Sequence, residues 1–137
     1  MAGKVVSVTQ PREFNFSDLA ASKSQTVTLQ EQINCSQYDY MDMIVRVHDD
    51  ANIGGGAKIE VVAVTDGHTE YDPNQTFFGD PIATASLTSS PTAGTLKIVS
   101  ASGLLGRALA VQVVATQDAQ QQSMSARISV ELVLKSR

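Results

Sequence analysis

Apolar and polar residues alternate in the segment just before the C-terminus, over residues 126–135. One side of this segment holds only apolar residues, namely Ala126, Ile128, Val130, Leu132 and Leu134. The other side holds Arg127, Ser129, Glu131 and Lys135, and only Val133 departs from the pattern. A period of two predicts a β-strand with one buried face and one solvated face.

The same alternation recurs along the chain and predicts eight strands. They cover residues 4–9, 24–29, 41–48, 57–65, 82–88, 95–101, 107–116 and 124–134. Short strands separated by turn residues favour an all-β, antiparallel β-sandwich. Eight strands fit two four-stranded sheets, which is the jelly-roll count. An immunoglobulin-like sandwich is the alternative, although a chain with one Cys and no Trp lacks the Cys–Trp–Cys signature of antibody domains.

The length of 137 residues is typical of one domain, so we interpret residues 1–137 as a single sandwich. Residues 1–20 are expected to form an N-terminal arm, or a first strand plus a loop. The alternating aromatics of the loop at 13–19 would cover one end of the core. Segments 41–48 and 57–65 predict a hairpin around the glycines at 54–56. Residues 66–81 form the longest stretch without periodicity, and such loops are often functional.

The charge of the chain argues against nucleic acid and membrane partners. Its net charge is -4, and its 10 basic residues are scattered rather than clustered. Charged residues make up only 18% of the chain, against about 25% in average proteins. Low charge is also typical of surfaces that meet a neighbouring subunit. The N-terminus has no signal peptide, so synthesis and assembly are expected in a cytoplasm.

Two loops carry acidic residues that offer oxygen ligands for a cation such as Ca²⁺. The candidates are Asp49, Asp50, Asp66 and Asp72, with His68 and Asp80 nearby. Their spacing matches no known calcium loop. Turn preference alone accounts for all of these aspartates, so we interpret them as solvated turn residues and expect no metal or other cofactor.

No motif for catalysis is found, and we expect the chain not to be an enzyme. His48 and His68 have no recognisable catalytic or zinc-binding companions. The glycines before Lys58 lack the spacing of a phosphate loop. No serine lies in a nucleophile elbow, and Glu60 and Glu131 are interpreted as solvated strand residues. Cys35 is the only cysteine, so it forms no intrachain disulfide and is expected to be buried.

Aromatic residues are the candidates for contact with a partner. They are Tyr71, Phe77 and Phe78 in the long loop, and Phe14 and Phe16 near the N-terminus. Paired phenylalanines on a long loop are typical of anchors that insert into a neighbour. The alternative is that they cover the open end of their own sandwich. A sugar-stacking platform that includes Tyr38 and Tyr40 is a further possibility, although aromatics form only 5% of the chain.

The middle and end of the chain resemble small structural proteins of tailed bacteriophages. The resembling segments are residues 43–48, 56–61, 104–111 and 128–134, within a β-strand pattern that spans residues 41–135. The resemblance implies a virion component, either a capsid decoration (cement) protein or a minor capsid protein. Such a protein would bind the major capsid protein or other virion subunits, form a homo-oligomer in the particle, and perform no chemistry.

Two other functional classes remain open. One is a carbohydrate- or ligand-binding sandwich, including one carried on a phage tail or baseplate, with the tyrosines on a concave face or loop set. The other is a small cupin-like jelly-roll enzyme, which would need a cluster of histidine ligands. With only two histidines in the chain, this second class is the weaker candidate.

Overall fold

The structure is a computed structural model that describes residues 3–35, 37–66, 78–104 and 108–136. These residues form nine strands. Their bounds are β1 Gly3–Asn15, β2 Ser24–Asn34, β3 Tyr40–Val47, β4 Asn52–Ile53, β5 Lys58–Asp66, β6 Phe78–Leu87, β7 Leu96–Ser102, β8 Ala108–Thr116 and β9 Met124–Lys135. All eight predicted strands are found, and β4 is a short ninth. Among the described residues, no helix could cross a membrane.

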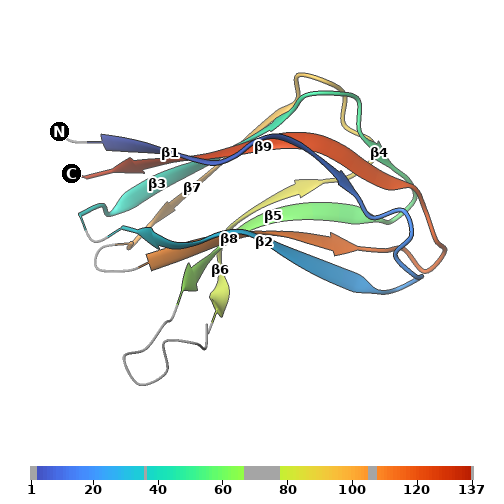
Figure 1. Cartoon of the computed structure of the whole chain (residues 1–137), viewed down its shortest axis with the longest axis horizontal. Coiled ribbons are helices and arrows are strands. Elements are labelled where there is room, and N and C mark those ends of the chain that lie inside the picture. Colours follow the sequence, from blue (N-terminus) through green and yellow to red (C-terminus); the bar gives the residue numbers. More distant parts are fainter. Residues whose placement is uncertain (1–2, 36, 67–77, 105–107, 137) are drawn as a thin grey trace.

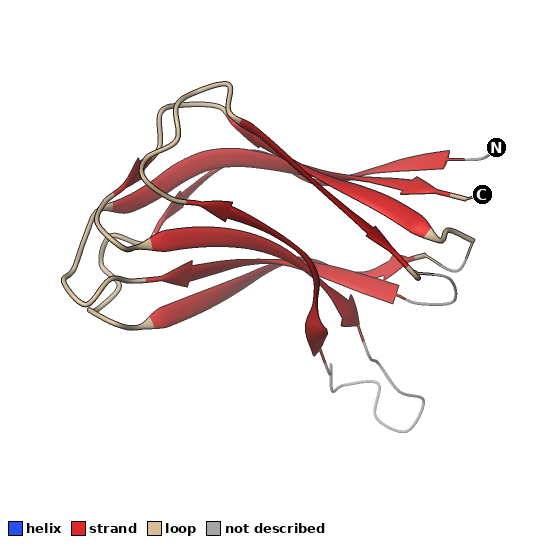
Figure 2. Cartoon of the chain, turned by 180° about the vertical axis from the view of Figure 1, so that it is seen from behind, coloured by secondary structure: helices blue, strands red, loops and turns tan. Residues whose placement is uncertain are grey.

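The strands form two sheets that lie one above the other (Figures 1 and 2). Sheet A has the order β1-β9-β3-β7, and β4 adds to it by pairing with β9. Sheet B has the order β2-β8-β5-β6. Every pairing is antiparallel. Gly3 pairs with Lys135, so the start of β1 and the end of β9 lie side by side at one end of the sandwich (Figure 1).

The strand pairings are nested along the chain, which is the topology of a jelly roll. The pairs β1–β9, β2–β8, β3–β7 and β5–β6 are the pairs of one long hairpin. This hairpin is rolled so that successive pairs alternate between the sheets. The predicted all-β, jelly-roll-like sandwich is confirmed. The immunoglobulin-like alternative is wrong, because that fold groups its strands differently.

The core fills the space between the sheets and follows the predicted alternation. The inward residues of β3 are Met41, Met43, Val45 and Val47, and those of β9 are Ala126, Ile128, Val130, Leu132 and Leu134, all buried. Phe14 and Phe16 are also buried, as predicted, and their rings stack with centroids 6.3 Å apart. Alternation predicted these faces correctly because the two inner surfaces must exclude water.

Two edge strands are longer than predicted because bulges hide their period. β1 runs past Pro11 to Asn15, with register shifts between Ser7 and Thr9 and between Thr9 and Arg12. β2 continues to Asn34, with shifts on either side of Gln30. A bulge inserts an extra residue and exchanges the two faces of the strand. The prediction of a loop over residues 13–19 is therefore wrong for its first part.

The predicted hairpin between residues 41–48 and 57–65 is also wrong. β3 lies in sheet A and β5 in sheet B, so the connection passes from one sheet to the other. Nor is the glycine stretch a loose loop. A Cβ at Gly55 would lie 2.7 Å from Asp118 Oδ2, and one at Gly54 would lie 2.8 Å from Gln122 Oε1. The glycines thus allow this connection to pack closely on the turn between β8 and β9.

Candidate functional site: the outer face of sheet A

The predicted acidic candidates do not form a cation site among the described residues. The Asp49 carboxylate lies 3.8 Å from the Arg127 guanidinium, and the Asp50 carboxylate accepts a hydrogen bond from the Ala93 amide at 2.8 Å. No group of three or more metal-ligating side chains lies together in the described part of the chain. Asp66 ends β5, and only its backbone is described. Asp72 lies outside the described residues.

The polar residues considered for chemistry are separated by the fold. Glu60 lies on the outer face of sheet B and Glu131 on the outer face of sheet A, so the two carboxylates cannot act as a pair. His48 Nε2 lies 2.7 Å from Ser129 Oγ, while His68 lies outside the described residues. Next to the glycines, Asp118 accepts a hydrogen bond from Gly56 N at 3.2 Å. A carboxylate in this position would repel a phosphate.

Cys35 is buried, as predicted, and its thiol donates a weak hydrogen bond to the Ile33 carbonyl at 3.6 Å. Burial raises the pKa of this thiol to about 11, and the nearby Lys4 opposes the shift only in part. A protonated, enclosed thiol is a poor nucleophile. We therefore assign Cys35 to the core.

The aromatic contact candidates are divided between the core and the undescribed loop. Phe14 and Phe16 are buried in the chain's own core, which leaves little of either ring for a partner. The Arg12 guanidinium covers the Phe14 ring, 4.8 Å from its centroid. Tyr71 and Phe77 lie outside the described residues, and only the backbone of Phe78 is described. Their role as anchors stays a prediction. Tyr38 and Tyr40 are half-buried at one end of sheet A.

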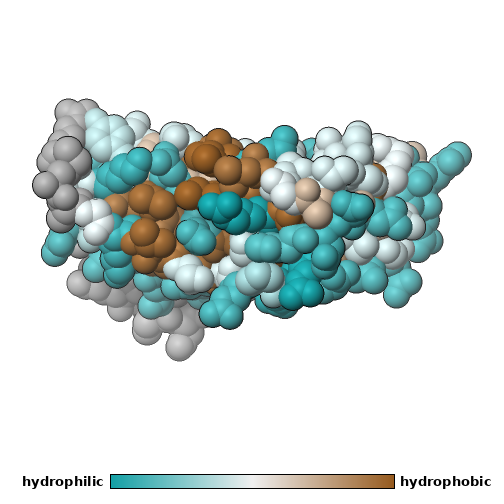
Figure 3. Space-filling model, turned by 90° about the horizontal axis from the view of Figure 1, so that it is seen from above, coloured by the Kyte–Doolittle hydropathy of each residue, from teal (hydrophilic) through white to brown (hydrophobic). Residues whose placement is uncertain are grey.

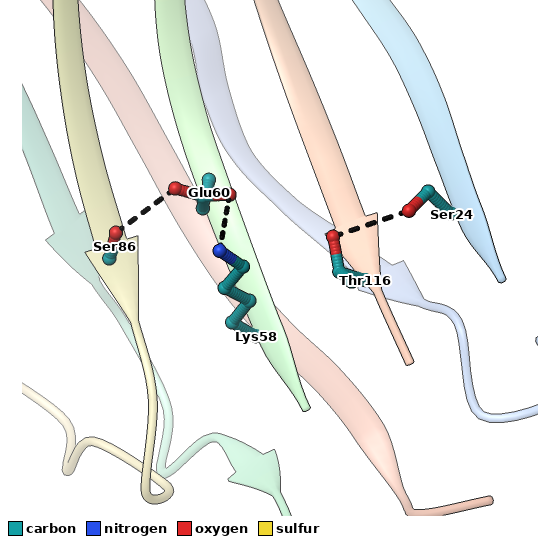
Figure 4. A network of polar contacts seen from close by, with 5 residues as sticks. All are labelled: Ser24, Lys58, Glu60, Ser86 and Thr116. Carbon is teal, nitrogen blue, oxygen red and sulfur yellow. Dashed lines mark hydrogen bonds and ion pairs between the residues drawn. The ribbon is translucent and has the colours of Figure 1, made fainter. Parts of the chain in front are cut away.

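The outer face of sheet B is largely satisfied within the chain. Figure 4 shows its polar end, where Lys58 pairs with Glu60 at 3.3 Å and Glu60 accepts a hydrogen bond from Ser86 at 3.3 Å. Beside them, Ser24 donates to Thr116 at 3.4 Å. The apolar residues of this face, Val62, Val64 and Ala110, are already buried in a second small cluster.

The outer face of sheet A is different because it leaves large apolar side chains in solvent. Val5, Ile98 and Leu96 are 62%, 57% and 45% exposed. Ile44 and Val133 share this face and are half-buried, because Ile44 pairs with Ile98 and Val133 with Val5. We call these five residues the sheet A patch. Figure 3 looks onto this face and shows apolar side chains gathered over its left half, interrupted by hydrophilic ones.

Charged residues lie between and beside the apolar ones. Lys135 Nζ pairs with Asp42 Oδ2 at 2.6 Å, and Ser100 Oγ donates to Asp42 Oδ1 at 2.5 Å. These two hydrogen bonds lower the pKa of the Asp42 carboxyl below its usual value. Glu131 of β9 lies directly across from Ile44, and Arg46 lies one row further along β3. Neither has an ion-pair partner within the part of the chain that the structure describes.

Our sequence reasoning did not identify this surface, although it contained a signal. Val133 is the residue that breaks the alternation of the last strand, and Ile44 sits among the outward Asp42 and Arg46 of its strand. An apolar residue on the solvated face of a strand indicates contact with something other than water. Only the strand register shows that these exceptions gather on one face. Chemically, this face offers apolar contacts and ion pairs to a protein surface, and its described residues include no catalytic constellation.

No protein-family model matches the chain, and no curated protein matches it by sequence. Solved structures match it in fold. The VP2 subviral particle of infectious bursal disease virus has a TM-score of 0.59 and 13% identity, covering 99% of this chain and 33% of that chain. T=1 particles derived from infectious bursal virus give a TM-score of 0.57, 11% identity, and coverage of 99% and 32%.

A pilus protein of Bacillus endospore appendages is 11% identical, covering 100% of this chain and 93% of that chain. Its TM-score of 0.42 carries no argument for a shared fold. The chain spans about a third of the length of the two virus-particle proteins. At these identities the likeness shows the fold alone, an all-β jelly-roll-like sandwich.

Proposed function

We propose that this chain is a non-enzymatic structural component of a virus particle, assembled in a host cytoplasm. In finer terms, it is a capsid decoration or minor capsid protein that binds the major capsid protein or its own copies. The observation that carries the proposal is the sheet A patch. Large exposed apolar residues, beside two charges with no ion-pair partner among the described residues, are the features of a surface that binds a neighbour.

Two further observations support this assignment. The fold is similar to that in the VP2 subviral particle of infectious bursal disease virus and in the T=1 particles derived from infectious bursal virus. The resemblance of residues 41–135 to small phage structural proteins points to the same class. A sugar-binding module is less favoured, because Phe14 and Phe16 are buried and Tyr38 and Tyr40 are half-buried.

The test is density-gradient sedimentation of a lysate from the native source, with the chain followed by mass spectrometry. A virion component is expected to migrate with megadalton particles, together with a major capsid protein. The chain should stay with the particles after nuclease treatment, because its binding does not depend on nucleic acid. Recovery only at the top of the gradient would overturn the proposal and make glycan-binding screens the next step.

A further inference from the structure

We propose that the outer face of sheet A binds the same face of a second copy of this chain, related by a twofold axis. The inference rests on the proposed structural function, for which it names one contact surface. A twofold interface uses one patch twice, so the patch must be complementary to itself. The charges and the apolar residues of this face meet that requirement, and its area sets how strong the contact can be.

The charges of the face are self-complementary. Arg46 and Glu131 lie on adjacent strands, one row apart, and neither has an ion-pair partner among the described residues. A twofold axis that runs parallel to the two facing sheets, midway between these residues, would place Arg46 of each copy opposite Glu131 of the other. The contact would therefore contain two equivalent ion pairs. Two other charges of this face, Asp42 and Lys135, already pair with each other within the chain.

The same axis brings the exposed isoleucines together. Ile44 pairs with Glu131 on one side and with Ile98 on the other, so all three lie in one row across the sheet. With strands about 4.8 Å apart and rows about 6.8 Å apart, the line midway between Arg46 and Glu131 passes close to Ile44 and Ile98. Each isoleucine would then face its own counterpart. Leu96, next to Arg46 on β7, would extend this apolar contact.

The area of the face agrees with a weak, repeated contact. Four strands about 4.8 Å apart, over the eight residues of β3 at about 3.3 Å each, cover about 500 Å². Two such faces together bury about 1,000 Å², which is the lower limit for a specific interface. We therefore expect a dissociation constant above about 1 µM for isolated chains, with the contact strengthened by repetition in a particle.

Charge reversal tests the contact directly. Arg46→Glu gives a chain with acids at both positions, and Glu131→Arg gives a chain with bases at both positions. Each variant alone should associate at least about tenfold more weakly than the unchanged chain, because both ion pairs become repulsive. An equimolar mixture should recover dimers, since every opposed pair is then complementary. Sedimentation velocity at low salt is the measurement, because salt screens the pairs.

Matched controls separate this contact from a general effect of charge. Lys23→Glu and Glu31→Arg make the same changes in net charge at exposed positions outside sheet A. These variants should associate like the unchanged chain, alone and when mixed. A third variant, Ile98→Ser, should weaken association at least about tenfold without changing the far-ultraviolet circular dichroism spectrum.

Three results would overturn the proposal. The first is an unchanged chain that stays monomeric at millimolar concentration. The second is undiminished association of Arg46→Glu and Glu131→Arg, which would place the contact elsewhere, for example at the β7 edge. The third is failure of the mixture to recover dimers when both variants are folded. None of these results affects the gradient experiment, so a virion component with a different contact surface would still be recognised.

Discussion

At the scale of single residues, Gln117 is a buried polar side chain that joins two loops of the fold. It is only 3% exposed, yet its amide makes four hydrogen bonds. Its Nε2 donates to the carbonyls of Leu19 at 3.0 Å and Gln122 at 3.1 Å. Its Oε1 accepts from the amides of Asp118 at 3.0 Å and Gln122 at 3.1 Å. One side chain thus fastens the β8–β9 turn to the loop after β1.

Replacing this amide by an apolar side chain of similar size should be costly. Gln117→Leu leaves four backbone groups without their partner, and we expect a loss of about 2–4 kcal/mol in the free energy of unfolding. Gln112→Leu is the control, because Gln112 lies on the outer face of sheet B with one hydrogen bond to Thr28. The control should change stability by about 0.5 kcal/mol or less. Urea denaturation measures both, and equal losses would contradict this role for Gln117.

The Cys35 thiol allows a second prediction at this scale. Because its pKa is raised to about 11, the folded protein holds the thiol proton over a pH range where the unfolded chain releases it. The resulting stability is fully present below about pH 9 and should decline as the pH rises toward 11. Cys35→Ala should lack this decline in thermal melts from pH 8 to pH 11. A parallel decline in both proteins would assign it to other groups.

At the scale of elements, close packing of the glycine connection on the β8–β9 turn holds this end of the sandwich together. Gly55 has φ +55°, and an added Cβ would meet Asp118 Oδ2 at 2.7 Å. Asp118 would have to move and would then lose its hydrogen bond from Gly56 N. Gly94 also has a positive φ, of 87°, but a Cβ there would meet nothing within 4 Å.

A comparison of alanine substitutions at these two glycines distinguishes the free-energy cost of crowding from that of backbone strain. Gly94→Ala should lower the free energy of unfolding by about 1–2 kcal/mol, the cost of a left-handed residue with a side chain. Gly55→Ala should lower it by about 1 kcal/mol more, because a hydrogen bond to a carboxylate is lost as well. Chemical denaturation of the two variants is the measurement. In the Asp118→Ala background, where this hydrogen bond is already absent, Gly55→Ala should cost only about as much as Gly94→Ala, and a persisting extra cost there would refute the crowding argument.

The strands also show which parts of the fold could be predicted from the sequence. Alternation predicted eight strands and the inner faces of β3 and β9, because burial acts on each strand separately. It could not predict which strands pair, since β3 and β5 alternate well but lie in different sheets. It also shortened β1 and β2, whose bulges interrupt the period. Pairing depends on contacts between distant residues, which a local period does not record.

At the scale of the whole molecule, the two outer faces differ. Sheet B pairs several of its polar side chains within the chain, whereas sheet A exposes apolar residues together with Arg46 and Glu131, which have no ion-pair partner among the described residues. Ile44 and Val133 were visible in the sequence as exceptions to alternation. The relation of Arg46 to Glu131 was not visible, because it depends on the register between β3 and β9. The fold class was therefore predictable from the sequence, and the candidate contact surface only in fragments.

The nested pairing of the strands has a consequence for the kinetics of folding. The outermost pair, β1–β9, joins the two ends of the chain, and each inner pair joins segments closer in sequence. Closing long loops costs entropy before contacts compensate for it, so we expect pairing to begin at β5–β6 and to end at the termini. Refolding should take milliseconds to seconds in stopped-flow circular dichroism. Newly made chains would then expose the edge of β9 that β1 covers until the last step, and a neighbouring copy could compete with β1 for that edge.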